Sequence, residues 1–157
     1  MLEIIINNRQ LKFEDGEIYS YIKYGSSKTY KWFLLKSYGN GKGYHQLCIN
    51  KKKYYYHRVI YKLHNQNWDI DDVSPNNFID HIDRDKLNNN IDNLRVVSNQ
   101  KNQFNTNCKG YCWHKHANKW KAQIMIDGKH QHLGYFDVEE DAKNAYLAAK
   151  KIYHILI

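Results

Sequence analysis

Four polar side chains in the middle of the sequence have the right types to cleave a phosphodiester bond. Asp80 and His81 are adjacent, and carboxamides follow at Asn93 and Asn102. Phosphodiester hydrolysis needs an acceptor for the proton of the attacking water and stabilisation of the charge on phosphate and leaving group. A neutral histidine suits the first task, and a hard cation such as Mg²⁺, which prefers oxygen ligands, suits the second. Asp80 and the side-chain oxygen of Asn102 are therefore candidate metal ligands, and His81 is the candidate proton acceptor.

Short strands and helices must bring these groups together. Segments 77–80 and 94–97 are expected as strands joined by a polar loop. Ser98 is expected to cap a helix over 99–105, because its side chain can accept backbone N–H bonds. Upstream, Tyr44 to Tyr56 predicts a hairpin and 57–65 a short helix.

Taken singly, these residues have plainer interpretations. An Asp-His pair is commonly a hydrogen-bonded surface pair, and Asn88 to Asn90 is interpreted as a turn. His57 and Arg58 can both have structural roles. Arg58 has the alternative of a contact with phosphate. The complete ordered set is far more specific than any of its parts.

The ordered set resembles the His-Asn-His (HNH) endonucleases with a strand-strand-helix metal fold, especially the homing enzymes of phages and other mobile elements. The residues that carry this resemblance are HRVIY (57–61), Asp80-His81, Asn93-Leu94-Arg95 and Asn102. The resemblance implies that His81 is the general base and that Asp80 and Asn102 bind the metal. It further implies that Asn93, the middle asparagine, fixes the loop that orients the histidine. The family's third position is often histidine, and asparagine there disfavours zinc.

Charge is distributed unevenly along this basic chain, which has a net charge of +8. Residues 18–68 include ten Lys or Arg and no acid, and residues 93–126 include six and again none. Between them, residues 69–92 hold seven aspartates. An acidic island between basic stretches suits a metal site beside a phosphate track, although solvated loops with incidental charge would read the same way. Arg58, Arg95 and Lys101 are the candidate phosphate contacts near the motif.

The last third of the chain predicts a three-stranded sheet and one helix. Residues 120–126 alternate between apolar and polar, Asp127-Gly128 is a two-residue hairpin turn, and 130–136 can be the next strand. Asp137 is expected to open an amphipathic helix, with Glu140 completing a capping box. Residues 109–153 resemble the Apetala-type, ethylene-response-factor DNA-binding domain, on the motifs GY (110–111), KWKAQI (119–124), LGYFD (133–137) and EEDA (139–142).

This resemblance implies that the sheet lies in the major groove of DNA. The alternation assigns Trp113, Trp120, Ala122 and Ile124 to the helix side. The residues assigned to the outer, DNA-facing side are Cys112, His114, Lys121, Gln123, Met125, His130 and His132. The family's arginines are absent from these positions, and a merely solvated sheet face is the alternative. Cys108, Cys112, His114 and His116 lack the paired spacing of a zinc site.

These observations predict an α+β protein with a strand-rich N-terminal region, a strand-strand-helix metal nuclease core and a C-terminal three-stranded antiparallel sheet packed on one helix. The expected domains are 1–107, with the metal motif at 79–105, and 108–157. The predicted function is Mg²⁺- or Mn²⁺-dependent hydrolysis of double-stranded DNA by a monomer without a small-molecule cofactor. A DNA-binding protein with a decayed nuclease site, or an RNA-binding or RNA-cleaving protein, remains open.

Three cysteines and the lack of any apolar run of about 20 residues predict a soluble, intracellular protein without disulfides. The apolar run near the N-terminus is too short for a signal peptide.

Overall fold

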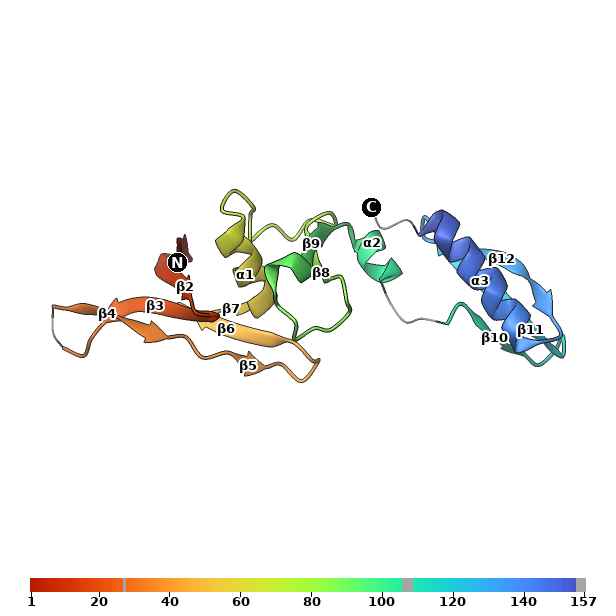
Figure 1. Ribbon diagram of the computed structural model, residues 1–157, viewed down its shortest axis with the longest axis horizontal. Coiled ribbons are helices and arrows are strands. Elements are labelled where there is room, and N and C mark those ends of the chain that lie inside the picture. Colours follow the sequence, from red (N-terminus) through yellow and green to blue (C-terminus); the bar gives the residue numbers. More distant parts are fainter. Residues whose placement is uncertain (27, 106–108, 155–157) are drawn as a thin grey trace. The chain divides into compact units, whose positions relative to one another are not determined.

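The computed structural model describes residues 1–26, 28–105 and 109–154, which belong to two compact units, 1–97 and 98–157 (Figure 1). Strands predominate over helices, in agreement with the predicted α+β class. Helix α2 (Asn99–Phe104) belongs to the second unit. The division into domains 1–107 and 108–157 remains a prediction.

The first unit begins with a four-stranded antiparallel sheet. Its strands follow one another in space as in sequence: β1 (Leu2–Ile6), β2 (Arg9–Glu14), β3 (Glu17–Lys23) and β4 (Tyr30–Leu34). Asn7-Asn8 and Asp15-Gly16 make the first two turns with positive φ at every position, the conformation that two-residue hairpins favour. One face of this sheet buries Leu11 and Ile18 completely.

The hairpin and helix predicted from Tyr44 to Asn65 are confirmed. Strands β5 (Tyr38–Gly39), β6 (His45–Ile49) and β7 (Lys52–Tyr55) form a small antiparallel sheet. The chain then enters helix α1 (Tyr56–His64), which buries Val59, Ile60 and Leu63. These side chains join Leu11 and Ile18 in the core of the unit, so α1 is fixed against the first sheet by apolar burial.

The central motif follows as a two-stranded antiparallel sheet. Strand β8 (Phe78–His81) pairs with β9 (Leu94–Val97), and the short 3₁₀ helix η1 (Ile91–Asn93) precedes β9. Ile79 and Leu94 are buried in the same core as α1. Both predicted strands are therefore present, and packing anchors them beside α1.

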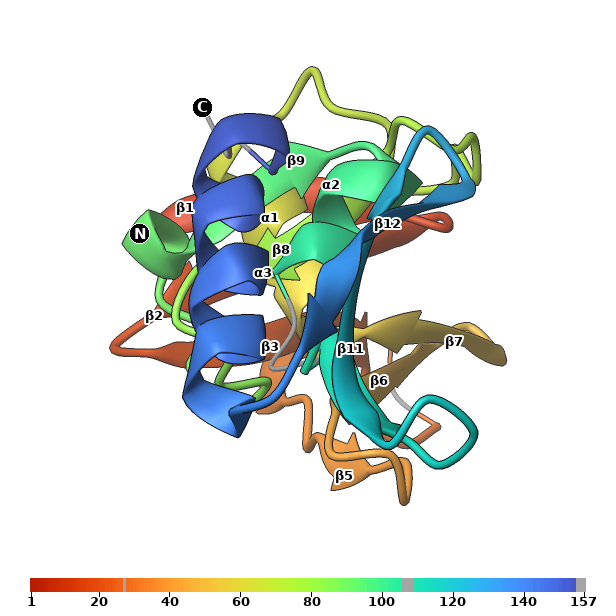
Figure 2. The same ribbon diagram turned by 90° about the vertical axis from the view of Figure 1, so that its right-hand side faces the viewer.

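The second unit contains α2 and the predicted sheet-plus-helix module. The Ser98 side chain accepts a hydrogen bond from the Lys101 backbone N–H at 3.2 Å, which confirms it as the cap of α2. Strands β10 (Tyr111–His114), β11 (Lys119–Ile126) and β12 (Lys129–Phe136) form an antiparallel sheet, and helix α3 (Glu139–Tyr153) lies across one face (Figures 1 and 2). Ile124, Tyr146 and Ala149 form its core.

Two details of this module differ from the sequence-based expectation. Val138 is the N-cap residue of α3, and no side chain caps the helix there. Asp137 instead forms an ion pair with Lys119, the first residue of β11, at 3.1 Å. Trp113, expected beneath the helix, is 44% exposed and packs edge-on against Trp120.

Gly110 is required by the packing of the second unit. A Cβ atom at this position would lie 2.0 Å from the ring of Tyr146, a core residue of α3. The side-chain-free residue thus lets the chain enter β10 against the helix.

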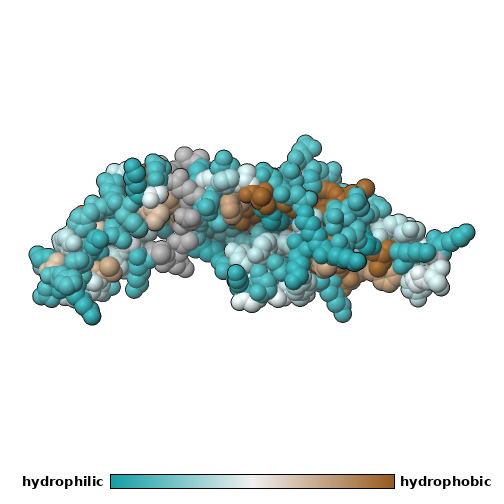
Figure 3. Space-filling model, turned by 180° about the vertical axis from the view of Figure 1, so that it is seen from behind, coloured by the Kyte–Doolittle hydropathy of each residue, from teal (hydrophilic) through white to brown (hydrophobic). Residues whose placement is uncertain are grey.

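The surface is largely polar. Most of the face seen in Figure 3 is hydrophilic, with hydrophobic residues gathered in a few patches. Among the described residues, none of the helices combines the length and apolar character needed to cross a membrane.

Candidate active site

Strand β8 ends with Asp80 and His81, next to helix α1 (Figure 1). Both residues are buried, each with 5% of its surface exposed. Because successive residues of a strand point to opposite faces, the carboxylate and the imidazole have different neighbours. The strand therefore supplies both chemical groups at one place while different partners hold them.

Asp80 is held by Arg95, its cross-strand partner on β9. The Arg95 Nε and Nη2 atoms both donate to Asp80 Oδ2, at 3.0 and 2.8 Å. A charge-assisted contact of this kind is short and fixes the direction of the carboxylate. Arg95 was predicted to contact DNA. In the structure its guanidinium binds Asp80, and a DNA contact through it remains a prediction.

His81 is held through its ring by residues from three segments. Its Nε2 lies 3.1 Å from Asn89 Oδ1. Its ring packs edge-on against the His57 ring, with centroids 4.9 Å apart, and lies 6.1 Å from the Tyr44 ring. Asn89 could not be singled out from the sequence, because it lies in an asparagine-rich loop whose pattern indicates only a turn.

His57 is a buried histidine directly beside the candidate base. Burial, together with the nearby His81 and Arg58, lowers its pKa from 6.5 to about 3. His57 is therefore neutral at physiological pH. A neutral neighbour supports the His81 ring by packing and adds no second positive charge.

The burial of His57 predicts a pH-dependent loss of stability. In the unfolded chain, His57 has a pKa of about 6.5 and binds a proton below that pH. In the folded protein, it stays neutral down to about pH 3. The stabilising contribution is therefore complete above pH 6.5 and falls as the pH drops. Between pH 6.5 and 5 we expect the free energy of unfolding to fall by about 1.5–2 kcal/mol. The variant His57→Gln should lack this pH-dependent fall. Urea unfolding at several pH values measures it.

The matched control is His45→Gln, which alters an exposed histidine on β6. Its unfolding profile should keep the acid-side slope of the unmodified protein. An unchanged slope in His57→Gln would contradict the assignment of this slope to His57.

Asn93 closes the loop between β8 and β9. Its Nδ2 donates to Asp83 Oδ1 at 2.9 Å and to the Asn88 carbonyl at 2.8 Å, and its Oδ1 accepts from the Asp83 N–H at 3.0 Å. Its backbone carbonyl also accepts from the Ile82 N–H at 2.9 Å. Hydrogen bonds from Asn88 and Asn93 lower the pKa of Asp83, which favours the charged form that accepts them. One buried side chain thus ties both ends of the loop together beside His81.

Arg58, another predicted phosphate contact, is engaged inside the first unit. Its guanidinium donates to the backbone carbonyls of Asn77, Ile70 and Asp72, at 2.9, 2.8 and 3.1 Å. It also lies 4.6 Å from the Trp68 ring centroid. These contacts give Arg58 the role of bracing the loop between α1 and β8. A phosphate contact by Arg58 remains a prediction.

Asn102 and Lys101 lie in α2, in the second unit. The Asn102 N–H donates to the Ser98 carbonyl at 2.9 Å, within the first turn of the helix. The approach of Asn102 to Asp80, like a phosphate contact by Lys101, therefore remains a prediction.

The outer face of the second unit's sheet carries the residues expected there. Lys121 pairs with Cys112, Gln123 with His132, and Met125 with His130 across the strands, all on the side away from the buried Ala122 and Ile124. His114 lies on the same outer side, opposite Lys119.

Tyr135 is an outer-face residue that simple alternation misses. The register shifts between Ala122 and Gln123, so that Leu133 is an extra residue in β12. After this bulge the alternation is reversed, which turns Tyr135 outward. Its ring lies 5.3 Å from that of His114 and 4.7 Å from that of His132.

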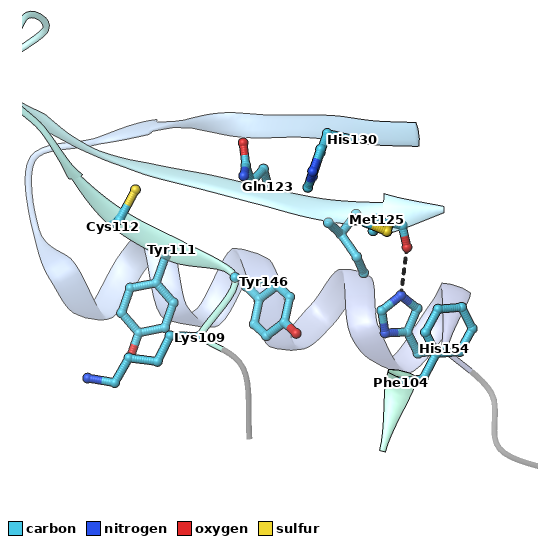
Figure 4. Close-up of a pocket in the computed structure, with 11 residues that line it drawn as sticks. Phe104, Lys109, Tyr111, Cys112, Gln123, Met125, His130, Tyr146 and His154 are labelled. Atoms are coloured by element: carbon cyan, nitrogen blue, oxygen red, sulfur yellow. Dashed lines mark hydrogen bonds between the residues drawn. The ribbon is translucent and has the colours of Figure 1, made fainter. Parts of the chain in front are cut away.

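A separate cavity of about 410 Å³ lies in the second unit (Figure 4). Tyr111, Ile124 and Tyr146 contribute apolar surface to it, and at one end His154 Nε2 donates to the Met125 carbonyl at 2.9 Å. Its described lining contains no carboxylate. The residues predicted to cleave phosphodiester bonds, Asp80 and His81, lie instead at the end of β8.

Histidine, cysteine and carboxylate groups do not gather in threes with metal-binding geometry anywhere in the described ranges. Cys108, one member of the zinc set considered from the sequence, lies outside those ranges. A site with one carboxylate and one carboxamide, as proposed for Asp80 and Asn102, is of a different composition.

Residues 54–104 match the family model for HNH endonucleases. The matched segment begins in β7 and contains Asp80, His81, Asn93 and Asn102. This part of the chain is therefore similar to HNH endonuclease domains, in agreement with the predicted enzyme class.

The chain is also similar to two curated viral proteins. It is 33% identical over 129 residues to an uncharacterized HNH endonuclease of Acanthamoeba polyphaga mimivirus. That alignment covers 79% of this chain and 63% of the mimivirus protein. It is 27% identical over 84 residues to Protein 3.8 of Escherichia phage T7. That alignment covers 48% of this chain and 69% of the phage protein. The chain thus spans less than two thirds of the mimivirus protein's length. No solved structure is significantly similar to it.

Proposed function

We propose that this protein is a divalent-metal-dependent DNA endonuclease of the homing type, which hydrolyses phosphodiester bonds with His81 as general base. The observation that carries the proposal is the end of β8 within the HNH segment. There Asp80 and His81 are adjacent and buried, and the Asn93 side chain closes the loop beside them. The contacts of Asp80 and His81 support the roles proposed for them.

The contact between His81 and Asn89 supports Nδ1 as the basic nitrogen of the imidazole. An amide oxygen only accepts hydrogen bonds, so Nε2 must carry the proton in this contact, and the basic lone pair resides on Nδ1. Nδ1 accepts a proton from water while the water oxygen bonds to phosphorus and the bond from phosphorus to the leaving oxygen breaks. The His57 ring and the loop closed by Asn93 keep the imidazole in one orientation during this transfer.

Asp80 and the side-chain oxygen of Asn102 are the proposed ligands for Mg²⁺ or Mn²⁺. A carboxylate has two oxygens and about four lone-pair sites, so Asp80 can accept from Arg95 and still bind a hard cation. When bound, the cation stabilises the charge that develops on the phosphate and leaving oxygens. Arg95 restrains the carboxylate and orients it for this role.

Plasmid cleavage tests the proposed function directly. Supercoiled plasmid incubated with the protein and Mg²⁺ should be converted to nicked or linear DNA, and a chelator should prevent the conversion. Equal conversion in the presence of chelator would refute metal dependence. DNA binding without any cleavage would favour a decayed nuclease.

We further propose that the second unit binds double-stranded DNA with the outer face of its sheet, as in the Apetala-type domains it resembles, and that the protein acts as a monomer without a small-molecule cofactor. A sheet whose alternate side chains project from one face can enter the major groove, which is about 12 Å wide. The row of Lys121, Gln123, His130 and His132 supports this proposal by combining positive charge with hydrogen-bonding groups on one face.

A charge-removing substitution tests the outer face. Lys121→Gln should weaken duplex binding about 3–10-fold and lower the slope of log affinity against log salt by about one, because one phosphate contact is lost. Fluorescence anisotropy over a range of salt concentrations measures both quantities. Lys143→Gln, on helix α3, removes the same charge away from the outer face and should leave the slope nearly unchanged. Equal effects of the two substitutions would mean that the outer face is merely solvated.

A further inference from the structure

The first sheet carries a continuous row of aromatic side chains on the face that does not form the core. We call Tyr19, Tyr21, Tyr30 and Trp32 the aromatic row. Tyr21 lies directly opposite Trp32 in the register of β3 and β4, and Tyr30 lies opposite Lys23. Because residues two apart in a strand share a face, these side chains project together on one side of the sheet.

The hydrophobic core accounts for the other face of this sheet. Leu11 and Ile18 are fully buried, and Ser20, between Tyr19 and Tyr21 in the sequence, is 6% exposed. In contrast, Tyr21 is 37% exposed and Tyr30 is 54% exposed. The aromatic row therefore faces away from the core of its unit.

Three rings of the row, those of Tyr21, Tyr30 and Trp32, are in contact, and Lys12 lies between the rings of Tyr19 and Trp32. The Tyr21 and Tyr30 centroids are 5.6 Å apart, with their planes inclined by only 27°, and the Tyr21 and Trp32 centroids are 5.0 Å apart. Lys12 Nζ lies 5.0 Å from the Tyr19 centroid and 5.3 Å from the Trp32 centroid. The side chains thus form one extended aromatic surface.

Charge around the row favours an anionic partner. Lys23 is exposed opposite Tyr30, and residues 18–68 contain no Asp or Glu. The carboxylates on this face precede Ile18 in the sequence. Glu14 among them is paired with Lys12, and Glu17 lies at the far end of β3 from Lys23. The end of the row formed by Tyr21 and Tyr30 is therefore the positive end.

Aromatic rings beside positive charge suit the two parts of a single-stranded nucleic acid. Unpaired bases offer flat faces for stacking, while the phosphates are attracted by lysine. In a duplex the base faces are already stacked on one another, and only the edges of the bases are presented in the grooves. The exposed rings therefore favour an unpaired strand as the partner.

We propose that the outer face of the β1–β4 sheet binds single-stranded DNA by stacking unpaired bases on the aromatic row. The proposal extends the proposed function, from which it takes DNA as the partner. It assigns the row to a strand left unpaired, whereas the second unit is assigned to the duplex.

The test compares three ligands of equal length by fluorescence anisotropy, with the full chain in chelator. The ligands are a labelled oligothymidylate of about 15 nucleotides, an abasic deoxyribose-phosphate strand and a duplex. The protein should bind oligothymidylate about tenfold or more tightly than the abasic strand. Equal binding of the two single strands would show attraction by charge alone and overturn the proposal. The measured quantity is binding in chelator and not cleavage, so failure of the nuclease proposal would leave this result unaffected.

Substitutions then locate the site. The double variant Tyr21→Leu with Tyr30→Leu should bind oligothymidylate about tenfold or more weakly, with less than about a twofold change for the duplex. Tyr21→Phe with Tyr30→Phe keeps both rings and should retain binding, which separates stacking from folding. Tyr38→Leu alters a tyrosine on β5 that is 40% exposed and should have no effect. If the Tyr21→Leu, Tyr30→Leu double variant keeps its affinity for oligothymidylate, the aromatic row does not bind single strands. The same conclusion follows if this variant changes only self-association in light scattering.

Discussion

His81→Ala is expected to slow Mg²⁺-dependent plasmid cleavage by about 10²–10⁴-fold while leaving duplex binding nearly intact. The reason is that His81 is proposed to take the proton from the attacking water and not to hold DNA. Its ring is 5% exposed and packs against His57, so the substitution also leaves a small cavity in the first unit. Cleavage rates must therefore be measured under single-turnover conditions below the variant's unfolding temperature, which circular dichroism determines.

His45→Ala provides the control for this substitution, because His45 is exposed on β6. It should cleave at the rate of the unmodified protein. Full activity of a folded His81→Ala variant would eliminate His81 as the base.

Asp80→Asn is expected to reduce Mg²⁺-dependent cleavage at least about 100-fold and to raise the Mg²⁺ concentration needed for half-maximal rate. The estimate is a lower bound, because loss of an outer-shell partner alone commonly costs 10–100-fold in metal affinity or activity. The variant also loses its charge-assisted contact with Arg95. A guanidinium left with a neutral partner should lower the free energy of unfolding by about 1–3 kcal/mol.

Titration of the cleavage rate with Mg²⁺, together with urea unfolding, separates these two effects. Asp92→Asn is the matched control, because Asp92 is exposed in the same polar segment. It should change neither the Mg²⁺ requirement nor the stability appreciably. An unaltered Mg²⁺ requirement in Asp80→Asn would place the metal elsewhere and give the buried carboxylate a structural role as the partner of Arg95.

The sequence by itself determined the elements whose signals are short in range. Asp127-Gly128 adopts the positive φ angles of the predicted hairpin turn, and Ser98 caps the predicted helix. The strict alternation over residues 120–126 assigned the buried face of β11 correctly. Each of these features depends on residues only a few positions apart, so local turn chemistry and periodicity suffice to predict it. The adjacency of Asp80 and His81 is likewise a property of the chain.

Only the tertiary structure decided how these chemical groups are held. His57 packs against His81 from a helix 24 residues earlier in the sequence, because burial of α1 in the core of the first unit brings the two rings together. Asn89 is the hydrogen-bonding partner of His81. The asparagines next to it have the same side chain, so the conformation of the closed loop decides which of them contacts His81.

The same distinction explains contacts that residue type and spacing alone did not predict. An arginine in a basic stretch predicts a phosphate contact. In the structure, Arg58 donates to three backbone carbonyls of the loop before β8, and its position in the sequence does not predict these contacts. Tyr135 faces outward because one extra residue in β12 reverses the alternation. Residue type and spacing identified the groups capable of chemistry, whereas their partners depend on packing between segments far apart in the chain, and that packing exists only in the folded protein.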